Sequence, residues 1–118
     1  MKEKKILFLG LGSIGQRHLR NLIKLEKKIK IYAIRKINKS PLLNSKNIVI
    51  KGSVTKKYKI KNLKSIDDNK FDIIFITNPS SFHIDTFLKL KGQRDAYVFI
   101  EKPLDLSLKK ISSLNKLI

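Results

Sequence analysis

The 118-residue sequence contains no cysteine, which excludes a disulfide scaffold, a thiolate metal site and a cysteine nucleophile. No apolar run approaches the roughly 20 residues that a helix needs to cross a bilayer. The short apolar run after the basic N-terminus is interrupted by Gly10 and lacks a small-residue cleavage site, so it is not typical of a signal peptide. The sequence therefore predicts a cytoplasmic protein with no membrane association, and it predicts no metal site.

Acidic residues are also scarce, since 9 Asp and Glu stand against 27 Lys and Arg, for a net charge of +18. Such a charge favours a nucleic-acid-binding protein as a first interpretation. However, 23 of the basic residues are lysine and 4 are arginine, whereas nucleic-acid-binding proteins favour arginine and clustered aromatic side chains. Residues 1–59 carry 17 of the basic residues and two acidic ones. A general lysine bias explains this charge without a ligand, so nucleic acid binding is kept as the less favoured alternative.

Hydrophobic residues make up 42% of the chain, enough for a core, and the length suits one domain over residues 1–118. Short apolar runs predict strands at 6–9, 31–34, 48–50, 58–60, 71–77 and 96–100. Apolar residues at helical spacing predict helices at 14–26, 63–69, 81–91 and 107–118. Ser40 and Pro41 predict a turn. Because strands and helices alternate, we expect right-handed βαβ units and an α/β fold with a Rossmann-type, doubly wound parallel sheet.

A glycine-rich motif lies between the first predicted strand and the first predicted helix. Gly10, Gly12 and Gly15 form the pattern G-x-G-x-x-G in the context that dinucleotide binding requires. Gly10 allows a tight turn, Gly12 lets a pyrophosphate approach the backbone, and Gly15 lets helix and strand pack closely. The helix start, with Ser13 and Ile14, offers free N–H groups and a positive dipole end to the phosphates. The alternative is a glycine-rich turn without a ligand.

The end of the second predicted strand should lie near the adenosine ribose of such a ligand. About 20 residues beyond the glycines the chain has Arg35, with Ser40 nearby, and no acidic residue lies between Glu26 and Asp67. An acidic residue would suit the free 2′-hydroxyl of NAD, whereas an arginine suits the 2′-phosphate of NADP. The sequence therefore favours NADP over NAD, although an exposed arginine at a strand end is equally consistent with the basic composition.

Two further groups follow strands that should end at the same edge of the sheet, where open α/β sheets bind ligands. Thr77, Asn78 and Pro79 end the strand at 71–77, and His83 lies in the first turn of the next helix. Taken alone, His83 is more typical of a helix-terminus or solvent-facing histidine than of a ligand contact.

Glu101, Lys102 and Pro103 follow the strand at 96–100. A lysine at this edge can donate a hydrogen bond or a proton to a substrate oxygen. Spacing alone does not distinguish Lys102 from an ordinary surface lysine.

Together these motifs resemble the N-terminal half of the Gfo/Idh/MocA oxidoreductases. The resemblance rests on 10–18 (GLGSIGQRH), 77–83 (TNPSSFH) and 101–103 (EKP), whose order and spacing match, and it covers essentially the whole chain. It implies hydride transfer between a nicotinamide and a carbon that bears a hydroxyl, usually on a sugar, a nucleotide sugar or a cyclitol.

The resemblance also implies a role for each motif residue. The pyrophosphate would be held by Gly10, Gly12 and Gly15, with Ser13 and Ile14 lining the turn. The nicotinamide half of the cofactor would lie along Thr77, Asn78, Pro79 and His83. Glu101 would contact the cofactor's ribose, and Lys102 would reach the reacting oxygen of the substrate.

Members of this family run to about twice this length or more and carry a second α+β domain. That domain supplies an Asp/His pair, the substrate pocket and usually the oligomer interface, whereas this chain has only His18 and His83. We therefore expect a cofactor-binding domain without the substrate domain, into which the helix at 107–118 would lead. A non-catalytic dinucleotide-binding module is the alternative, and an oligomer stays possible.

Overall fold

A five-stranded parallel sheet forms the centre of the molecule in the computed structural model, which describes residues 3–35, 41–66, 69–78, 83–90, 92–93, 95–102 and 107–115. Its strands lie in the order β5-β2-β1-β6-β7, and every neighbouring pair is parallel. In chain order the strands are β1 (Lys4–Leu9), β2 (Ile29–Ile34), β5 (Lys61–Asn62), β6 (Ile73–Ile76) and β7 (Tyr97–Ile100). This is the expected Rossmann-type sheet.

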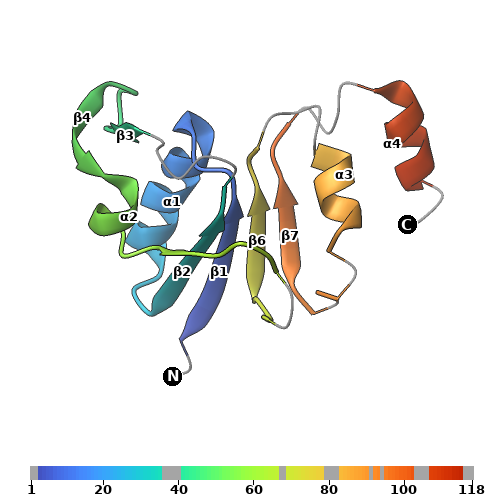
Figure 1. Cartoon of the computed structure of the whole chain (residues 1–118), viewed down its shortest axis with the longest axis horizontal. Coiled ribbons are helices and arrows are strands. Elements are labelled where there is room, and N and C mark those ends of the chain that lie inside the picture. The colour runs from blue at the N-terminus through green and yellow to red at the C-terminus, as the bar shows by residue number, and fades with distance from the viewer. Residues whose placement is uncertain are drawn as a thin grey trace.

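The strand order changes direction between β1 and β6. The chain begins in β1, moves outward through β2 to β5, and then crosses to the other side of β1 to form β6 and β7 (Figure 1). Leu9 of β1 pairs with Ile76 of β6, so these two strands end at the same level. In doubly wound sheets the ligand crevice lies at such a switch point, outside the carboxyl ends of the strands.

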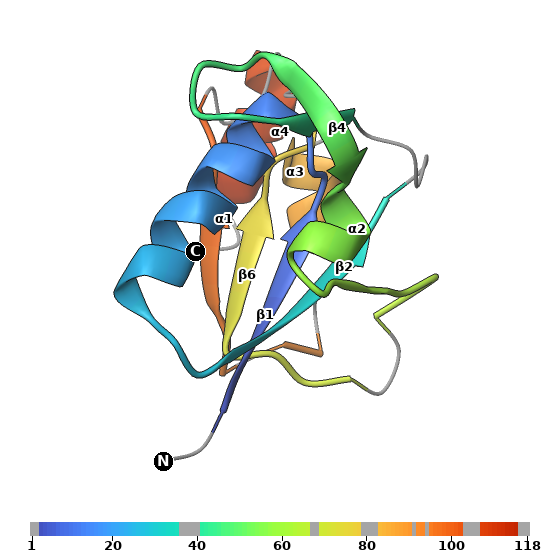
Figure 2. The same ribbon diagram turned by 90° about the vertical axis from the view of Figure 1, so that its left-hand side faces the viewer.

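Both faces of β1 are buried, because its alternate residues point to opposite sides of the sheet and each side packs against other elements. Ile6 and Phe8 pack with Leu19 on one face, against α1 (Ser13–Leu25) and α2 (Val54–Lys57). The other face, with Leu7 and Leu9, packs against α3 (His83–Leu88). Figure 2 shows α1 running along one side of the strands, and α4 (Leu108–Asn115) lies beside α3.

The connection from β2 to β5 differs from the expectation. An antiparallel hairpin of β3 (Pro41–Leu43) and β4 (Val49–Ser53) occupies it, so Pro41 belongs to a strand instead of the predicted turn, and β4 runs past the predicted strand at 48–50.

The strand predicted at 58–60 is wrong, because these residues form the turn that ends the short helix α2. Ser53 caps this helix through its side chain, and the Ile60 N–H donates to the Thr55 carbonyl at 2.9 Å. Tyr58 and Ile60 therefore pack on the core as a continuation of the helical turn, without strand pairing.

The prediction of a helix at 63–69 is also wrong, as far as the structure describes these residues. The Leu63 N–H donates to the Ala33 carbonyl of β2 at 2.8 Å, which extends the sheet, and Asn69 only closes a turn back to Ile66. Within the predicted helix at 81–91 the structure describes α3. After α3 the N–H groups of Lys89 and Leu90 each donate to the carbonyl three residues earlier, so the helix ends in a tighter turn before Gly92. No helix among the described residues is long and apolar enough to cross a membrane.

Candidate functional site

The turn between β1 and α1 is held tightly by two of its glycines. Gly10 has φ +106°, and a Cβ there would lie 2.8 Å from the backbone nitrogen of Asn78. A Cβ on Gly15 would lie 2.6 Å from the Gly10 carbonyl oxygen and 2.9 Å from Thr77 Oγ1. Real Cβ atoms do not approach other atoms this closely, so both positions require glycine, as expected for the turn and for close packing of helix and strand.

Gly12 lies in the opposite environment. It is exposed, and a Cβ there would meet no atom within 4 Å among the described residues. Gly12 is also the N-cap of α1, no side chain caps that end, and the first turn holds no acidic residue. The amides of the first turn, which include Ser13 and Ile14, have no partner within the helix. An anion that approaches Gly12 therefore meets open space, free N–H donors and the positive end of a helix dipole.

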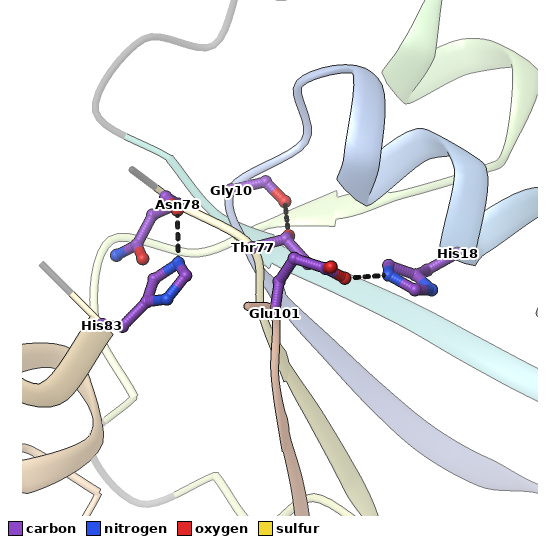
Figure 3. A network of polar contacts seen from close by, with 6 residues as sticks. All are labelled: Gly10, His18, Thr77, Asn78, His83 and Glu101. Atoms are coloured by element: carbon purple, nitrogen blue, oxygen red, sulfur yellow. Dashed lines mark hydrogen bonds and ion pairs between the residues drawn. The ribbon is translucent and has the colours of Figure 1, made fainter. Parts of the chain in front are cut away.

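The end of β6 is tied directly to this turn (Figure 3). Thr77 Oγ1 donates to the Gly10 carbonyl at 2.7 Å, and the Thr77 N–H donates to the Leu9 carbonyl at 3.1 Å. Thr77 therefore holds the glycine turn against the end of β6. A ligand bound across the switch point would contact both.

Asn78 and His83 form a second contact at the same strand end. His83 Nε2 donates to the Asn78 carbonyl at 2.7 Å, and Asn78 Nδ2 donates to Thr86 Oγ1 at 2.8 Å. His83 is the first residue of α3 and is only 1% exposed, so it is a helix-terminus histidine, as one of the two interpretations held, and the other interpretation, a solvent-facing histidine, is wrong. Asn78 Oδ1 is buried and accepts no hydrogen bond from any described residue. A buried acceptor without a donor is costly, and a ligand with an N–H or O–H group would relieve that cost.

Glu101 connects the end of β7 to α1. Its Oε2 lies 2.6 Å from His18 Nε2, and both side chains are partly buried. The His18 ring in turn lies against Phe75 and Phe99, at centroid distances of 5.8 and 5.0 Å. Glu101 Oε1 has no bond to a described residue, which leaves one oxygen of the carboxylate able to accept from a ligand. Lys102, the next residue, is exposed.

His18 is a functional candidate that the sequence reasoning missed. It lies in the motif at 10–18, but its partner is 83 residues away, and no local pattern predicts such a pair. Figure 3 shows Glu101 reaching toward His18 on one side of Thr77, with Asn78 and His83 on the other.

Arg35 directly follows β2 and is held by two neighbours. Its Nη2 donates to Thr55 Oγ1 and to Asn62 Oδ1, each at 2.9 Å, while its Nε is buried and bonds to no described residue. Burial lowers the pKa of the Arg35 guanidinium from its ordinary value, because the charged form loses water. Arg35 is therefore fixed at the strand end, which differs from the exposed arginine that the composition alone would explain.

The structure thus brings most of the predicted residues to one edge of the sheet, at the carboxyl ends of its parallel strands. Pro79, Ser40 and Pro103 lie outside the described residues. No group of three or more His, Cys, Asp or Glu that could hold a metal occurs within the part of the chain that the structure describes.

Comparison with known proteins gives one family and several structures. Residues 4–118 match the model of a family described as an oxidoreductase family with an NAD-binding Rossmann fold. No curated protein matches.

The solved structures that resemble this chain include scyllo-inositol dehydrogenase from Lactobacillus casei with NAD(H) and scyllo-inositol bound, with 21% identity and a TM-score of 0.69, over 99% of this chain and 33% of that one. UDP-N-acetylglucosamine 3-dehydrogenase from Acidithiobacillus ferrooxidans has 17% identity and a TM-score of 0.66, over 99% and 35%. GenD2 from gentamicin A biosynthesis, in complex with NAD, has 14% identity and a TM-score of 0.67, over 97% and 31%. At these identities the likeness shows the fold alone, and the chain spans about a third of the length of each of these structures.

Proposed function

The chain belongs to the Gfo/Idh/MocA oxidoreductase family, as its NAD-binding Rossmann domain, and on that premise we propose a function for its site. The chain binds NADP, or NAD, for a dehydrogenase that moves hydride to or from the hydroxyl-bearing carbon of a sugar, a nucleotide sugar or a cyclitol. The observation that carries this proposal is the open space at Gly12 in front of the free amides of α1, between two glycines that admit no side chain. The residues present fit a dinucleotide.

The chain's own residues would bind and orient the cofactor and donate hydrogen bonds to the substrate. A bound nicotinamide cofactor supplies the hydride chemistry. Gly12 and the first turn of α1, with Ser13 and Ile14, would hold the pyrophosphate, and Gly10 and Gly15 keep that turn in place. The cofactor's nicotinamide half would lie along Thr77, Asn78, Pro79 and His83.

Two residues at the end of β7 would serve the ribose and the substrate. Glu101 Oε1 would accept a hydrogen bond from a ribose hydroxyl while Oε2 keeps its bond to His18. Lys102 would donate a hydrogen bond to the substrate's reacting oxygen and hold a proton there.

A fluorescence titration of the chain with NADPH and with NADH tests this proposal. We expect saturable binding at one site per chain. A salt-dependent shift of DNA or RNA in the absence of nucleotide binding would instead support the nucleic-acid alternative. Saturable cofactor binding by a full-length form that turns over none of a panel of sugar-type substrates would support the non-catalytic module.

Replacing Arg35 by alanine should reduce the preference for NADPH. Since a hydrogen bond to a charged group contributes about 1.5–3 kcal/mol, we expect the Kd for NADPH to rise about tenfold or more and that for NADH to change much less. Isothermal titration of both nucleotides measures the two values. Thr55→Val is the matched control, because it removes one hydrogen-bond partner of Arg35 but keeps the charge of the guanidinium. Its affinity for NADPH should fall less than that of Arg35→Ala. An unchanged NADPH preference in Arg35→Ala contradicts the assignment.

Replacing Lys102 by alanine in a form that turns over substrate should depress hydride transfer much more than cofactor affinity. General acid catalysis contributes roughly 10²–10⁴-fold, so we expect kcat to fall about 100-fold with little change in the Kd for NADPH. Single-turnover absorbance at the nicotinamide band and a direct titration separate the two effects. Lys30→Ala, an exposed lysine of β2, serves as control. Equal losses in rate and affinity would make Lys102 a cofactor contact.

A further inference from the structure

Gln16 is a buried polar side chain that the proposed function leaves unused. It lies in the first turns of α1, directly after Gly15, and it is 0% exposed. A buried amide must have its hydrogen-bonding groups satisfied, so its partners indicate what it holds together.

All the partners of this amide are backbone groups of two separate segments. Gln16 Nε2 donates to the Leu11 carbonyl at 2.9 Å and to the Pro41 carbonyl at 2.8 Å. Its Oε1 accepts from the Leu43 N–H at 2.9 Å. Leu11 belongs to the turn between Gly10 and Gly12, whereas Pro41 and Leu43 belong to β3. The side chain therefore fastens β3 to the glycine turn.

A second side chain on the same helix face supports this attachment. Arg20, one helical turn beyond Gln16, donates from Nη1 to the Leu43 carbonyl at 3.3 Å. Between these contacts Leu42 is 3% exposed and packs in the core. β3 is thus held to α1 by hydrogen bonds at Pro41 and Leu43 and by apolar packing at Leu42 between them.

β3 is the first described strand after Arg35. Arg35 is anchored on one side by Thr55 and Asn62, and the chain that follows it is anchored at Pro41 by Gln16. The pyrophosphate lies at the glycine turn of such folds and the adenosine ribose lies at the end of the second strand. The pairing of Leu9 with Ile34 already sets the distance between the glycine turn and Arg35. Gln16 adds a second link, from the glycine turn to the chain that follows Arg35, at Pro41.

The geometry points to Gln16 as a positioning residue that sets the selectivity of the site for the adenosine half of the dinucleotide, by holding β3 against the glycine turn. This inference rests on the proposed function. It assigns to Gln16 an effect on the ratio of NADPH to NADH affinity, which a side chain with a purely structural role would not change.

Gln16→Leu removes all three hydrogen bonds at nearly constant volume and tests the inference. We expect the ratio of NADPH to NADH affinity, measured by titration of folded protein, to fall about tenfold, the equivalent of 1.4 kcal/mol. Gln93→Leu is the matched control. Gln93 is also buried, at 7% exposure, and bonds backbone groups of Phe71 and Asn69, but these lie at the amino end of β6. Its variant should keep the wild-type ratio.

The outcomes separate this inference from the proposed function. A wild-type chain that binds neither nucleotide overturns both. Where the wild type binds both nucleotides, three results overturn the inference alone. These are an affinity ratio that stays within about twofold in Gln16→Leu, a ratio that changes equally in Gln93→Leu, and a ratio that is already near one in the wild type.

If Gln16→Leu does not fold, two milder variants replace it. Gln16→Glu keeps the acceptor for the Leu43 N–H but loses both donors, and Arg20→Met removes only the bond to the Leu43 carbonyl. Both should lower the ratio, Gln16→Glu by more, and an unchanged ratio in both overturns the inference.

Discussion

Gly12→Val is expected to abolish dinucleotide binding while the chain stays folded. The valine would fill the open space at the N-terminus of α1, where no described atom lies within 4 Å of a Cβ, and would keep a pyrophosphate from the first-turn amides. We expect the Kd for NADPH to rise from the micromolar range to about 1 mM or more, which corresponds to a loss of roughly 4 kcal/mol. Fluorescence titration of the wild type and the variant measures this change.

The fold should tolerate this valine because Gly12 has φ −73° and ψ −158°, an extended conformation that other residues adopt. Loss of a favourable N-cap costs about 1 kcal/mol, so Tm should fall by no more than about 4 °C. Gly92→Val, at an exposed glycine with only Lys70 Nζ near its Cβ, is the control that should keep binding intact. Undiminished NADPH binding by Gly12→Val would show that the phosphates lie elsewhere.

The structural roles of Gly10 and Gly15 could be predicted from the sequence because they follow from the turn between a strand and a helix. A strand that turns at once into a helix needs a positive φ at Gly10 and a missing Cβ at Gly15, and both requirements hold in the structure. The centre of the parallel sheet was equally predictable, since β1 and β2 are short apolar runs with consecutive buried residues, and so are buried on both faces. The edge strand β5 is two exposed polar residues, Lys61 and Asn62, and no apolar run predicts it.

The connection between β2 and β5 could not be predicted in the same way. Tyr58 and Ile60 form an alternating pattern that suits a strand, yet they lie in the turn that ends α2. The cap at Ser53 begins that helix, and the bond from the Ile60 N–H to the Thr55 carbonyl closes its end. Local propensity was overridden by burial against the core, since both side chains reach it from the turn after α2.

The polar contacts that arrange the site depend on tertiary structure alone. Gln16 bonds residues 25 and 27 positions away, and His18 bonds Glu101 at 83 positions. Neither sequence separation has a signature in the sequence, although Gln16 and His18 directly follow the glycine motif, within the segment 10–18. The motif therefore predicts where a ligand would bind, whereas the side chains that fix the neighbouring segments become visible only when the strands are assembled.

Gly15→Val should give the opposite result to Gly12→Val, although the two positions are three residues apart. A Cβ at Gly15 would lie 2.6 Å from the Gly10 carbonyl oxygen, and that oxygen also accepts the hydrogen bond from Thr77 Oγ1. Gly10 cannot retreat, because it lies against the Asn78 backbone.

The helix α1 must therefore shift away from β1, although the substitution of glycine within a helix would otherwise help by a few tenths of a kcal/mol. Overpacking costs about 1–3 kcal/mol and occasionally more. For two methyl groups beyond the Cβ, we expect a loss of about 3 kcal/mol in the free energy of unfolding, and a fall in Tm of roughly 12 °C or more. Urea and thermal unfolding followed by circular dichroism measure both, with Gly15→Ala expected to fall between wild type and valine. A Gly15→Val chain as stable as the wild type would show that α1 does not need this close approach to β1.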